Sequence, residues 1–410
     1  MSSTDRHIPP AEYSVLALDQ IASAPVHDAP EQREIGRIVG AEAGPTFICV
    51  AGLHGNERAG VTAAKRALEV LGRRSECVRG EFIAIAGNLG AMRLGVRFRH
   101  RDFNRVWTEA RVAGVEDRAR AKKALDEEDI EQLELLATIR AIVQRARGPV
   151  YLVDLHSTSA QGLPYIIFGD TLGQRKFVGN LPLPIVIGLE DQLDGSLSAY
   201  WTNQGLITCA LEGGQHDDPS TTDNIEAVLL LGAETAGILG NARITEAVTA
   251  YNLLERRRGN LPRVMEVISR HAITKSDEFV MEPGFLNLAR VRAGQLLARD
   301  RNGEIRAPKD GYVLMPLYQG QGSEGFFWGR ECSPARLRIS ETLRKMKVDR
   351  FLRLLPGVKQ DPDRATRLVV DPNLARLLPL DVFATLGYRR VRKTADVMTV
   401  ERQSEQDPIF

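Results

Sequence analysis

The stretch Thr46-Phe47-Ile48-Cys49-Val50-Ala51 is an apolar run with several β-branched residues, and it predicts a buried strand. An amphipathic segment follows at 59–71, and a second apolar run follows at 80–86. A strand, a helix and a strand in this order are typical of an α/β sheet with helices on its faces. We therefore expect an α/β fold, in which functional sites gather beyond the carboxyl ends of the strands.

The same rhythm continues along the chain. The charged segment 109–147 carries apolar residues at helical spacing and predicts one or two surface helices. A long helix is expected at 223–239, because Asp223 near its start and Gly240 at its end fit the usual capping signals. Further strands are expected at 150–155, 163–168, 184–187 and 206–211.

After about residue 260 the chain changes to short runs separated by Gly, Pro, Asp and Asn, which predicts a small all-β domain. The remaining residues are basic on balance, with a helix expected at 340–355, and form an irregular or separately folded extension. The short runs lie at 264–269, 278–281, 296–299, 305–307, 312–315 and 325–328. We expect an N-terminal segment (1–44), a catalytic domain (45–258), a β domain (259–333) and a C-terminal extension of unknown role (334–410).

Composition narrows the classes of function. The chain has 410 residues, 43% of them hydrophobic, and a net charge of +1, which argues against nucleic-acid binding through a broad basic field. The cysteines Cys49, Cys77, Cys209 and Cys332 are far apart and do not resemble a disulfide framework. We see no signal peptide and no apolar run long enough to span a membrane. A cytoplasmic enzyme without a membrane partner, which could form a homo-oligomer, is expected.

Two segments carry metal-binding chemistry. His54 and Glu57 follow the strand at 46–51, and His156 ends the strand-like run at 150–155. Two imidazoles and one carboxylate form a catalytic zinc site, because three protein ligands leave the fourth position open for water. A lone His-x-x-Glu is also what an ordinary helix start looks like, where the helix dipole favours a Glu.

Between these segments lies a run of arginines. Asn104 and Arg105 combine an amide with a fixed guanidinium fork, which suits a substrate carboxylate. Arg97 could stabilise a carbonyl oxygen that becomes an oxyanion. The alternative is that these arginines belong to a solvated basic stretch.

Glu212 ends the strand-like run at 206–211 and precedes Gly213-Gly214. Burying a lone carboxylate is costly, so its place suggests a general base that faces an activated water. The alternative is an exposed Glu followed by a turn at the two glycines. His216 is more typical of a hydrogen-bonding loop residue than of a fourth ligand.

Together these motifs resemble the succinylglutamate desuccinylase/aspartoacylase family of zinc carboxypeptidase-like hydrolases. The resemblance covers roughly residues 45–330 and implies a mixed sheet flanked by helices, followed by a smaller all-β domain. It also implies zinc on His54, Glu57 and His156, with Glu212 as the general base. Arg97 would lie near the scissile carbonyl, and Asn104 and Arg105 on the substrate carboxylate. The motifs are His54-x-x-Glu57, Arg97, Asn104-Arg105, Asp154-Leu155-His156-Ser157-Thr158 and Glu212-Gly213-Gly214.

The sequence departs from the family pattern in three places. Family members that act on acidic amino acids carry an arginine about ten residues before the base, where this chain reads Tyr200-Trp201-Thr202-Asn203. Tyr318 is a candidate for the family's active-site tyrosine, although a tyrosine packed on the core is an equal alternative. The extension at 334–410 lies outside the resemblance.

These observations predict a zinc-dependent amidohydrolase that removes an acyl group from a small N-acyl amino acid. The product is expected to be an amino acid with a neutral or cationic side chain. The alternatives are a metallocarboxypeptidase that cleaves a peptide C-terminus, and an inactive hydrolase fold that binds a partner through its basic extension.

Overall fold

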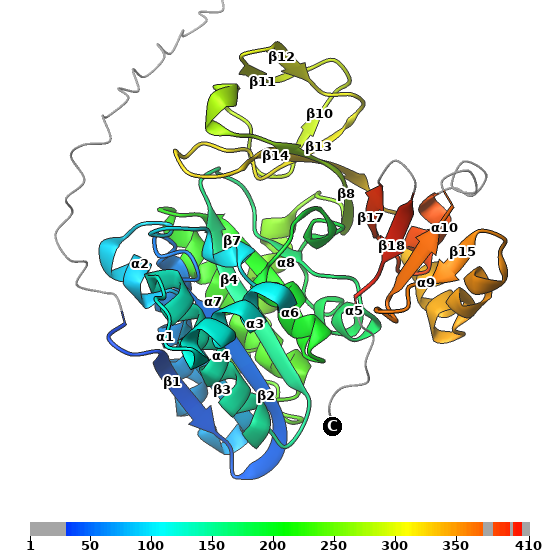
Figure 1. The fold of residues 1–410 in the computed structure, drawn as a ribbon. Coiled ribbons are helices and arrows are strands. Elements are labelled where there is room, and N and C mark those ends of the chain that lie inside the picture. The colour runs from blue at the N-terminus through cyan, green and yellow to red at the C-terminus, as the bar shows by residue number, and fades with distance from the viewer. Residues whose placement is uncertain (1–29, 372–379, 394–396, 404–410) are drawn as a thin grey trace, which may run out of the picture.

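The computed structural model describes residues 30–371, 380–393 and 397–403. Its centre is a sheet of 11 strands in the order β1-β3-β2-β4-β7-β5-β6-β8-β14-β13-β10. Helices cover both faces of its first part, and the last strands rise away from them (Figure 1). The expected α/β fold with a mixed sheet and smaller antiparallel sheets toward the C-terminus is confirmed.

Four parallel strands form the middle of the sheet. They are β3 (Arg79–Ala86), β2 (Glu42–Ala51), β4 (Val150–Thr158) and β7 (Ile207–Gln215). An additional strand, β1 (Glu34–Val39), pairs antiparallel with β3 inside the segment expected to precede the fold. On the other side, β5 (Tyr165–Ile167) is antiparallel to β7, and β6 (Ile185–Ile187) is parallel to β5.

Successive residues of β2 face opposite sides of the sheet, as the pleat requires. Phe47 and Cys49 pack in the core under α1 (Ala59–Arg73), α7 (Pro219–Ala236) and α8 (Thr245–Arg258). Ile48 and Val50 pack in a second core under α4 (Glu127–Arg145) and α6 (Leu197–Asn203). The sheet is therefore covered on both faces, which explains why its strands are apolar throughout. The shorter helices here are α2 (Leu89–Leu94), α3 (Glu109–Arg120) and α5 (Leu172–Val178).

One expected helix position is corrected here, and the buried side of another helix was not expected. α7 begins at Pro219, not at residue 223, because Asp218 caps it and proline is tolerated in the first turn. It ends before Gly237, which has a φ of 87°. The helices expected at 109–147 are α3 and α4, and α4 keeps an exposed face while it buries polar residues beside apolar ones. Ile130 lies on the exposed face, whereas Glu128 and Asp129 are buried.

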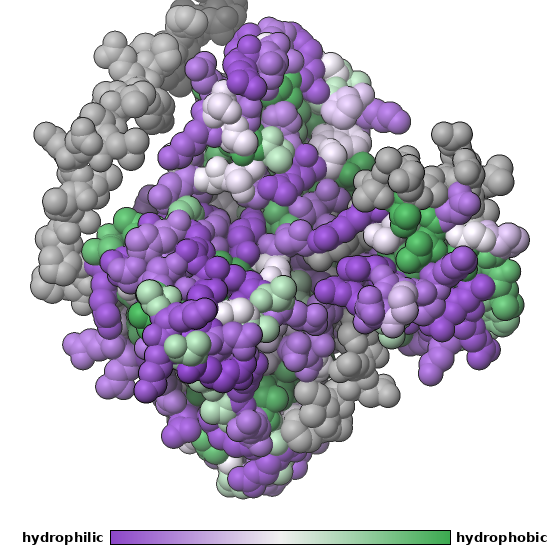
Figure 2. All heavy atoms as spheres, in the orientation of Figure 1, coloured by the Kyte–Doolittle hydropathy of each residue, from purple (hydrophilic) through white to green (hydrophobic). Residues whose placement is uncertain are grey.

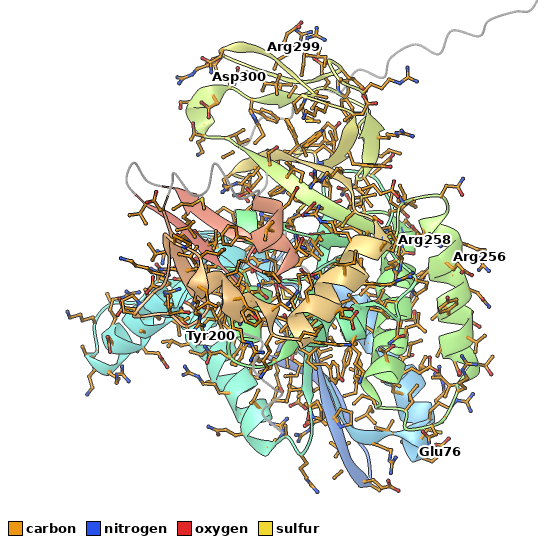
Figure 3. The ribbon with its side chains drawn as sticks, turned by 90° about the vertical axis from the view of Figure 1, so that its right-hand side faces the viewer. Glu76, Tyr200, Arg256, Arg258, Arg299 and Asp300 are labelled. Atoms are coloured by element: carbon orange, nitrogen blue, oxygen red, sulfur yellow. The ribbon has the colours of Figure 1, made fainter. Side chains whose placement is uncertain are left out.

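The region after residue 258 extends the central sheet. β8 (Val264–Ala272) pairs parallel with β6 and antiparallel with β14 (Glu324–Glu331), which continues into β13 (Gly311–Leu314) and β10 (Ala289–Val291). A separate sheet holds β12 (Gly303–Arg306), β11 (Leu296–Asp300) and β9 (Val280–Met281). Figure 3 shows Arg299 and Asp300 at the outer end of this sheet, whereas Arg256 and Arg258 point outward from α8.

The C-terminal extension has a core of its own. Its helix α9 (Pro334–Lys345) begins six residues before the expected start, because Ser333 caps it, and a 3-10 helix (Val348–Leu354) replaces the expected second half. α10 (Leu380–Thr385) and a four-stranded sheet complete it. The sheet order is β15 (Val358–Gln360), β16 (Arg367–Val370), β18 (Met398–Glu401) and β17 (Arg390–Lys393).

Asp170, between β5 and α5, anchors this extension to the rest of the chain. Its side chain is 1% exposed and accepts hydrogen bonds from the Nε atoms of Arg175, at 2.6 Å, and Arg389, at 2.8 Å. Arg344 of α9 lies 3.4 Å away. Burial would raise the pKa of Asp170, but Arg389, Arg175 and Arg344 hold that pKa well below its usual range. A buried carboxylate therefore joins the two parts of the chain.

None of the helices that the structure describes is long and apolar enough to cross a membrane. Figure 2 shows hydrophilic side chains over most of one face, with small hydrophobic areas between them. All four cysteines are free, and Cys49, Cys209 and Cys332 are buried. The cytoplasmic location remains a prediction.

We expect Asp170→Asn to destabilise the protein by roughly 3–5 kcal/mol at pH 7, the usual cost of breaking a buried ion pair. Because folding lowers the pKa of Asp170, its contribution is complete above the unfolded pKa of about 4 and is lost as pH falls through the lower folded value. Denaturant unfolding from pH 7 down to pH 3 checks this, and the difference in stability between the variant and the native protein should begin to shrink only below about pH 4. Asp117→Asn, at an exposed ion pair, is the control. Equal stability of all three proteins at pH 7 would contradict the anchor.

Candidate metal centre and active site

A cavity lies at the carboxyl ends of β2, β4 and β7, where sheets of this type place their sites. Polar and apolar side chains both line it. Loops from the catalytic part and the 315–324 segment before β14 both line it. The lining includes His54, Glu57, Arg97, Asn104, Arg105, His156, Leu189, Glu190, Leu193, Ser198, Glu212, Met315, Pro316, Leu317 and Glu324.

His54, Glu57 and His156 meet at the floor of this cavity. Their ligand atoms all lie within 4.8 Å of one another, and all three residues are buried. The Nδ1 atom of His54 lies 2.8 Å from one oxygen of Glu57, and the Nδ1 atom of His156 lies 3.0 Å from the other. The backbone amide of Ser157 also donates to Glu57, at 3.1 Å. One carboxylate thus faces two imidazole nitrogens.

Two further carboxylates hold the opposite ring nitrogens. The Nε2 atom of His54 lies 3.0 Å from Asp102, and that of His156 lies 2.9 Å from Asp154. A metal-binding histidine commonly has its second ring nitrogen on a carboxylate, which fixes the ring and makes it a better ligand. Asp154 is 0% exposed, so its place is costly unless a positive charge is nearby. The donor set therefore fits a divalent cation such as zinc.

The charges of this cluster shift one another's protonation. Burial would raise the pKa of Glu57, but His54 and His156 hold that pKa well below its usual range. Burial would lower the pKa of His156, but Asp154 and Glu57 raise that pKa well above its usual value. The cluster therefore favours a carboxylate with positive charge around it, and a metal dication would supply that charge.

Arg97 stands beside the metal-binding cluster. Its guanidinium lies 3.1 Å from Asp102 and 3.5 Å from Glu57. The loop that carries it is held by Glu128 of α4, which accepts the backbone amides of Arg99, at 2.8 Å, and His100, at 3.1 Å. The buried Glu128 of α4 therefore fixes the position of the loop that carries Arg97.

Asn104 and Arg105 line the cavity, but both already have partners. The Asn104 oxygen accepts the amide of Leu197 at 2.9 Å, and its Nδ2 atom lies 3.3 Å from His156. Arg105 lies 3.4 Å from Glu324 of β14, which also pairs with Arg270. A substrate carboxylate at Arg105 would thus compete with Glu324.

Glu212 lies directly beside His156, because the two are paired residues of the neighbouring parallel strands β4 and β7. The strand continues to Gln215, so the two glycines lie inside it and form no turn. Gly213 is needed because a Cβ atom there would collide with Ile225 of α7. Glu212 is 5% exposed, and burial raises its pKa to about 8 although the charge of His156 opposes the rise. A buried carboxylate of this pKa can accept and return a proton near neutral pH.

The structure does not bring Tyr318 into the cavity. Its hydroxyl donates to the carbonyl of Glu282 at 2.8 Å and accepts the amide of Phe285 at 3.0 Å. His216 contacts the Ser157 hydroxyl at 2.8 Å and is not part of the His-Glu-His group. The sequence analysis assigned no role to Asp102 or to Asp154, although Asp154 stands in a quoted motif, and it did not find Glu190, Ser198 or Glu324.

The fold and the cavity define a hydrolase-like α/β protein with a candidate metal centre, and comparisons with known proteins agree. Residues 43–235 match the family model described as the succinylglutamate desuccinylase/aspartoacylase catalytic domain. A succinylglutamate desuccinylase of Burkholderia pseudomallei is 27% identical over 268 residues, which is 61% of this chain and 69% of the relative.

Two solved structures are similar in fold. The succinylglutamate desuccinylase/aspartoacylase of Rhodobacter sphaeroides has a TM-score of 0.54 at 17% identity, over 72% of this chain and 88% of its own. The ectoine utilization protein EutE (DoeB) of Ruegeria pomeroyi has a TM-score of 0.51 at 20% identity, over 72% and 87%. Residues 43–235 of the chain therefore belong to the succinylglutamate desuccinylase/aspartoacylase family, whose named relatives are deacylases.

We expect His156→Ala to abolish stoichiometric zinc binding, because it removes one of three ligands. Elemental analysis of the purified protein measures this. His271→Ala is the matched control, since His271 lies on β8 and packs against Phe326, outside the cavity. Full zinc occupancy in His156→Ala would rule out this ligand set.

Proposed function

We propose that the protein is a zinc-dependent amidohydrolase that removes the acyl group from a small N-acyl amino acid. The observation that supports it most directly is Glu57 between the Nδ1 atoms of His54 and His156, with Glu212 on the neighbouring strand. If one of the expected metal ligands or the base were replaced by another residue, an inactive fold would be suggested. Every expected ligand, base and arginine is present, so we do not favour a scaffold role.

The residues of the chain would divide the reaction among them. A zinc ion held by His54, Glu57 and His156 would lower the pKa of water and polarise the amide carbonyl. Glu212 takes a proton from the water oxygen as it attacks the carbonyl carbon. Arg97 faces the negative charge that grows on the carbonyl oxygen. When the carbon–nitrogen bond breaks, Glu212 returns the proton to the leaving amine, and the acyl group leaves as a carboxylic acid.

The charges around the cavity indicate which amino acid leaves. Arg97 and Arg105 are the only Lys or Arg side chains among the described residues that line it, whereas Glu190 and Glu324 add negative charge. Asn104 and Arg105 would hold one carboxylate. A second carboxylate entering a desolvated cavity without a cation would cost several kcal/mol. We therefore propose an N-acyl amino acid whose side chain is neutral or cationic.

A metallocarboxypeptidase is the second candidate, because it would use the same ligands and base. The segment 315–324 bears on the choice, since Met315, Pro316 and Leu317 line the cavity from the β region. A wall at this place leaves less room for a peptide chain than for a small amide. The structure thus favours the small substrate.

A panel of substrates tests the assignment. The zinc-loaded protein should hydrolyse N-acetyl derivatives of neutral or basic amino acids with a higher kcat/KM than N-acetylaspartate, N-succinylglutamate or dipeptides. Amine release is the measurement. If an acidic substrate had the highest kcat/KM, the proposed specificity would be contradicted. If a dipeptide had the highest kcat/KM, the carboxypeptidase would be favoured.

Glu212→Gln should lower kcat on the best substrate of that panel by on the order of 10²–10⁴, while zinc content stays unchanged. The amide keeps the shape of the side chain but cannot take the proton. Steady-state kinetics and elemental analysis are run on the same preparation. Turnover near that of the native protein would move the base elsewhere, and loss of zinc would make Glu212 a ligand.

A further inference from the structure

The segment 189–198 forms one side of the cavity, and we call it the cavity-wall segment. Leu189, Glu190, Leu193 and Ser198 line the cavity from it. On its inner side it is fixed by residues 104–107, which follow the loop that carries Arg97. The carbonyl oxygen of Gly195 accepts the amide of Trp107 at 3.0 Å, and the amide of Leu197 donates to the side-chain oxygen of Asn104. The wall and the residues proposed to bind the substrate carboxylate are thus one connected unit.

On its outer side the same segment touches the C-terminal extension. The Nε2 atom of Gln403, just after β18, donates to Glu190 at 2.7 Å. The other oxygen of Glu190 accepts a hydrogen bond from the Ser198 hydroxyl at 2.5 Å. Arg392 of β17 lies 2.8 Å from Asp194. Glu190 is 3% exposed, so its carboxylate relies on partners from within the protein.

The backbone beside Gln403 is shaped to receive it. Gly169 lies against this side chain, and a Cβ atom at residue 169 would collide with the Gln403 amide. The next residue is Asp170, the buried anchor that Arg344 and Arg389 of the extension contact. Gln403 therefore packs closely on Gly169, just after β5, and donates to Glu190 from there.

We propose that the C-terminal extension is part of the active-site architecture, and that Gln403 is a positioning residue that holds the cavity-wall segment through Glu190. The extension then does more than bind a partner or add stability. It closes the outer side of a wall whose inner side faces the substrate. Residues 334–410 lie outside the part of the chain that matches the family's catalytic domain, so this support is a feature of this chain and not of that domain.

The proposal predicts an effect on substrate binding more than on chemistry. Gln403 is not among the residues that line the cavity, and the metal-binding cluster and Glu212 have other supports. Loss of its hydrogen bond should loosen the wall, which raises KM, and should leave kcat within about twofold. A hydrogen bond to a charged group is strong enough for a roughly tenfold change.

Hydrogen exchange of the full-length protein measures the wall without any substrate. We expect amides of the cavity-wall segment to exchange roughly tenfold faster in Gln403→Ala, and faster still in Gln403→Glu, where two carboxylates would meet. Gln360→Glu is the matched control. Gln360 also lies in the extension, but its side-chain amide donates to the carbonyl oxygens of Arg364 and Arg367, which belong to the extension itself. That variant should leave the cavity-wall segment as it is in the native protein.

Unchanged exchange at 189–198 in both Gln403 variants would overturn the proposal. Equal loosening by Gln360→Glu would overturn it as well, because the effect would then be general destabilisation of the extension. The expected effect on KM rests on the proposed function, because it takes the cavity as the substrate site. The expected effect on hydrogen exchange does not. If the protein proves inactive on every amide while exchange responds to Gln403 alone, the proposed function fails and the support of the wall stands.

Discussion

Glu57 lies between two imidazoles, with one carboxylate oxygen facing the Nδ1 atom of each. A buried carboxylate is tolerated only when it is paired, so this contact constrains the strands that deliver the two histidines. The register of β2, β4 and β7 meets the constraint by setting Val50 opposite Asp154 and His156 opposite Glu212. A slip of one residue in β4 would turn His156 to the other face of the sheet and would break the cluster.

Much of this site could be predicted from local patterns. His54 and His156 each follow an apolar strand, and neighbouring parallel strands end at the same edge of a sheet, so their meeting follows from the pattern. The features that the sequence left open depend on packing between distant segments. The turn at Gly213 stayed an alternative because the sequence does not show that α7 packs on β7 at Ile225. The sequence also does not show that Glu128 of α4 accepts backbone amides of the loop that carries Arg97.

The contacts on the outer side of the cavity could not be predicted either, because they also join segments that are far apart in the sequence. Gln403 and Glu190 are 213 residues apart, and no local periodicity reports such a contact. Arg389 meets Asp170 across a similar span. The residues of the extension have a core of their own, and the buried ion pair of Arg389 with Asp170 ties that core to the catalytic part of the chain. Tyr318, chosen for its type and neighbourhood, is instead bonded to the backbone of the β region.

The central claim is that one zinc ion binds between His54, Glu57 and His156 and leaves Glu212 free to act as a base. Crystallographic anomalous scattering measured on both sides of the zinc absorption edge tests it most directly. The account predicts a single strong maximum within bonding distance of both Nδ1 atoms and of the Glu57 carboxylate, with Asp102 and Asp154 still on the Nε2 atoms. A maximum on the Nε2 atoms, coordination by Glu212, or no maximum at this cluster in zinc-loaded crystals would contradict it.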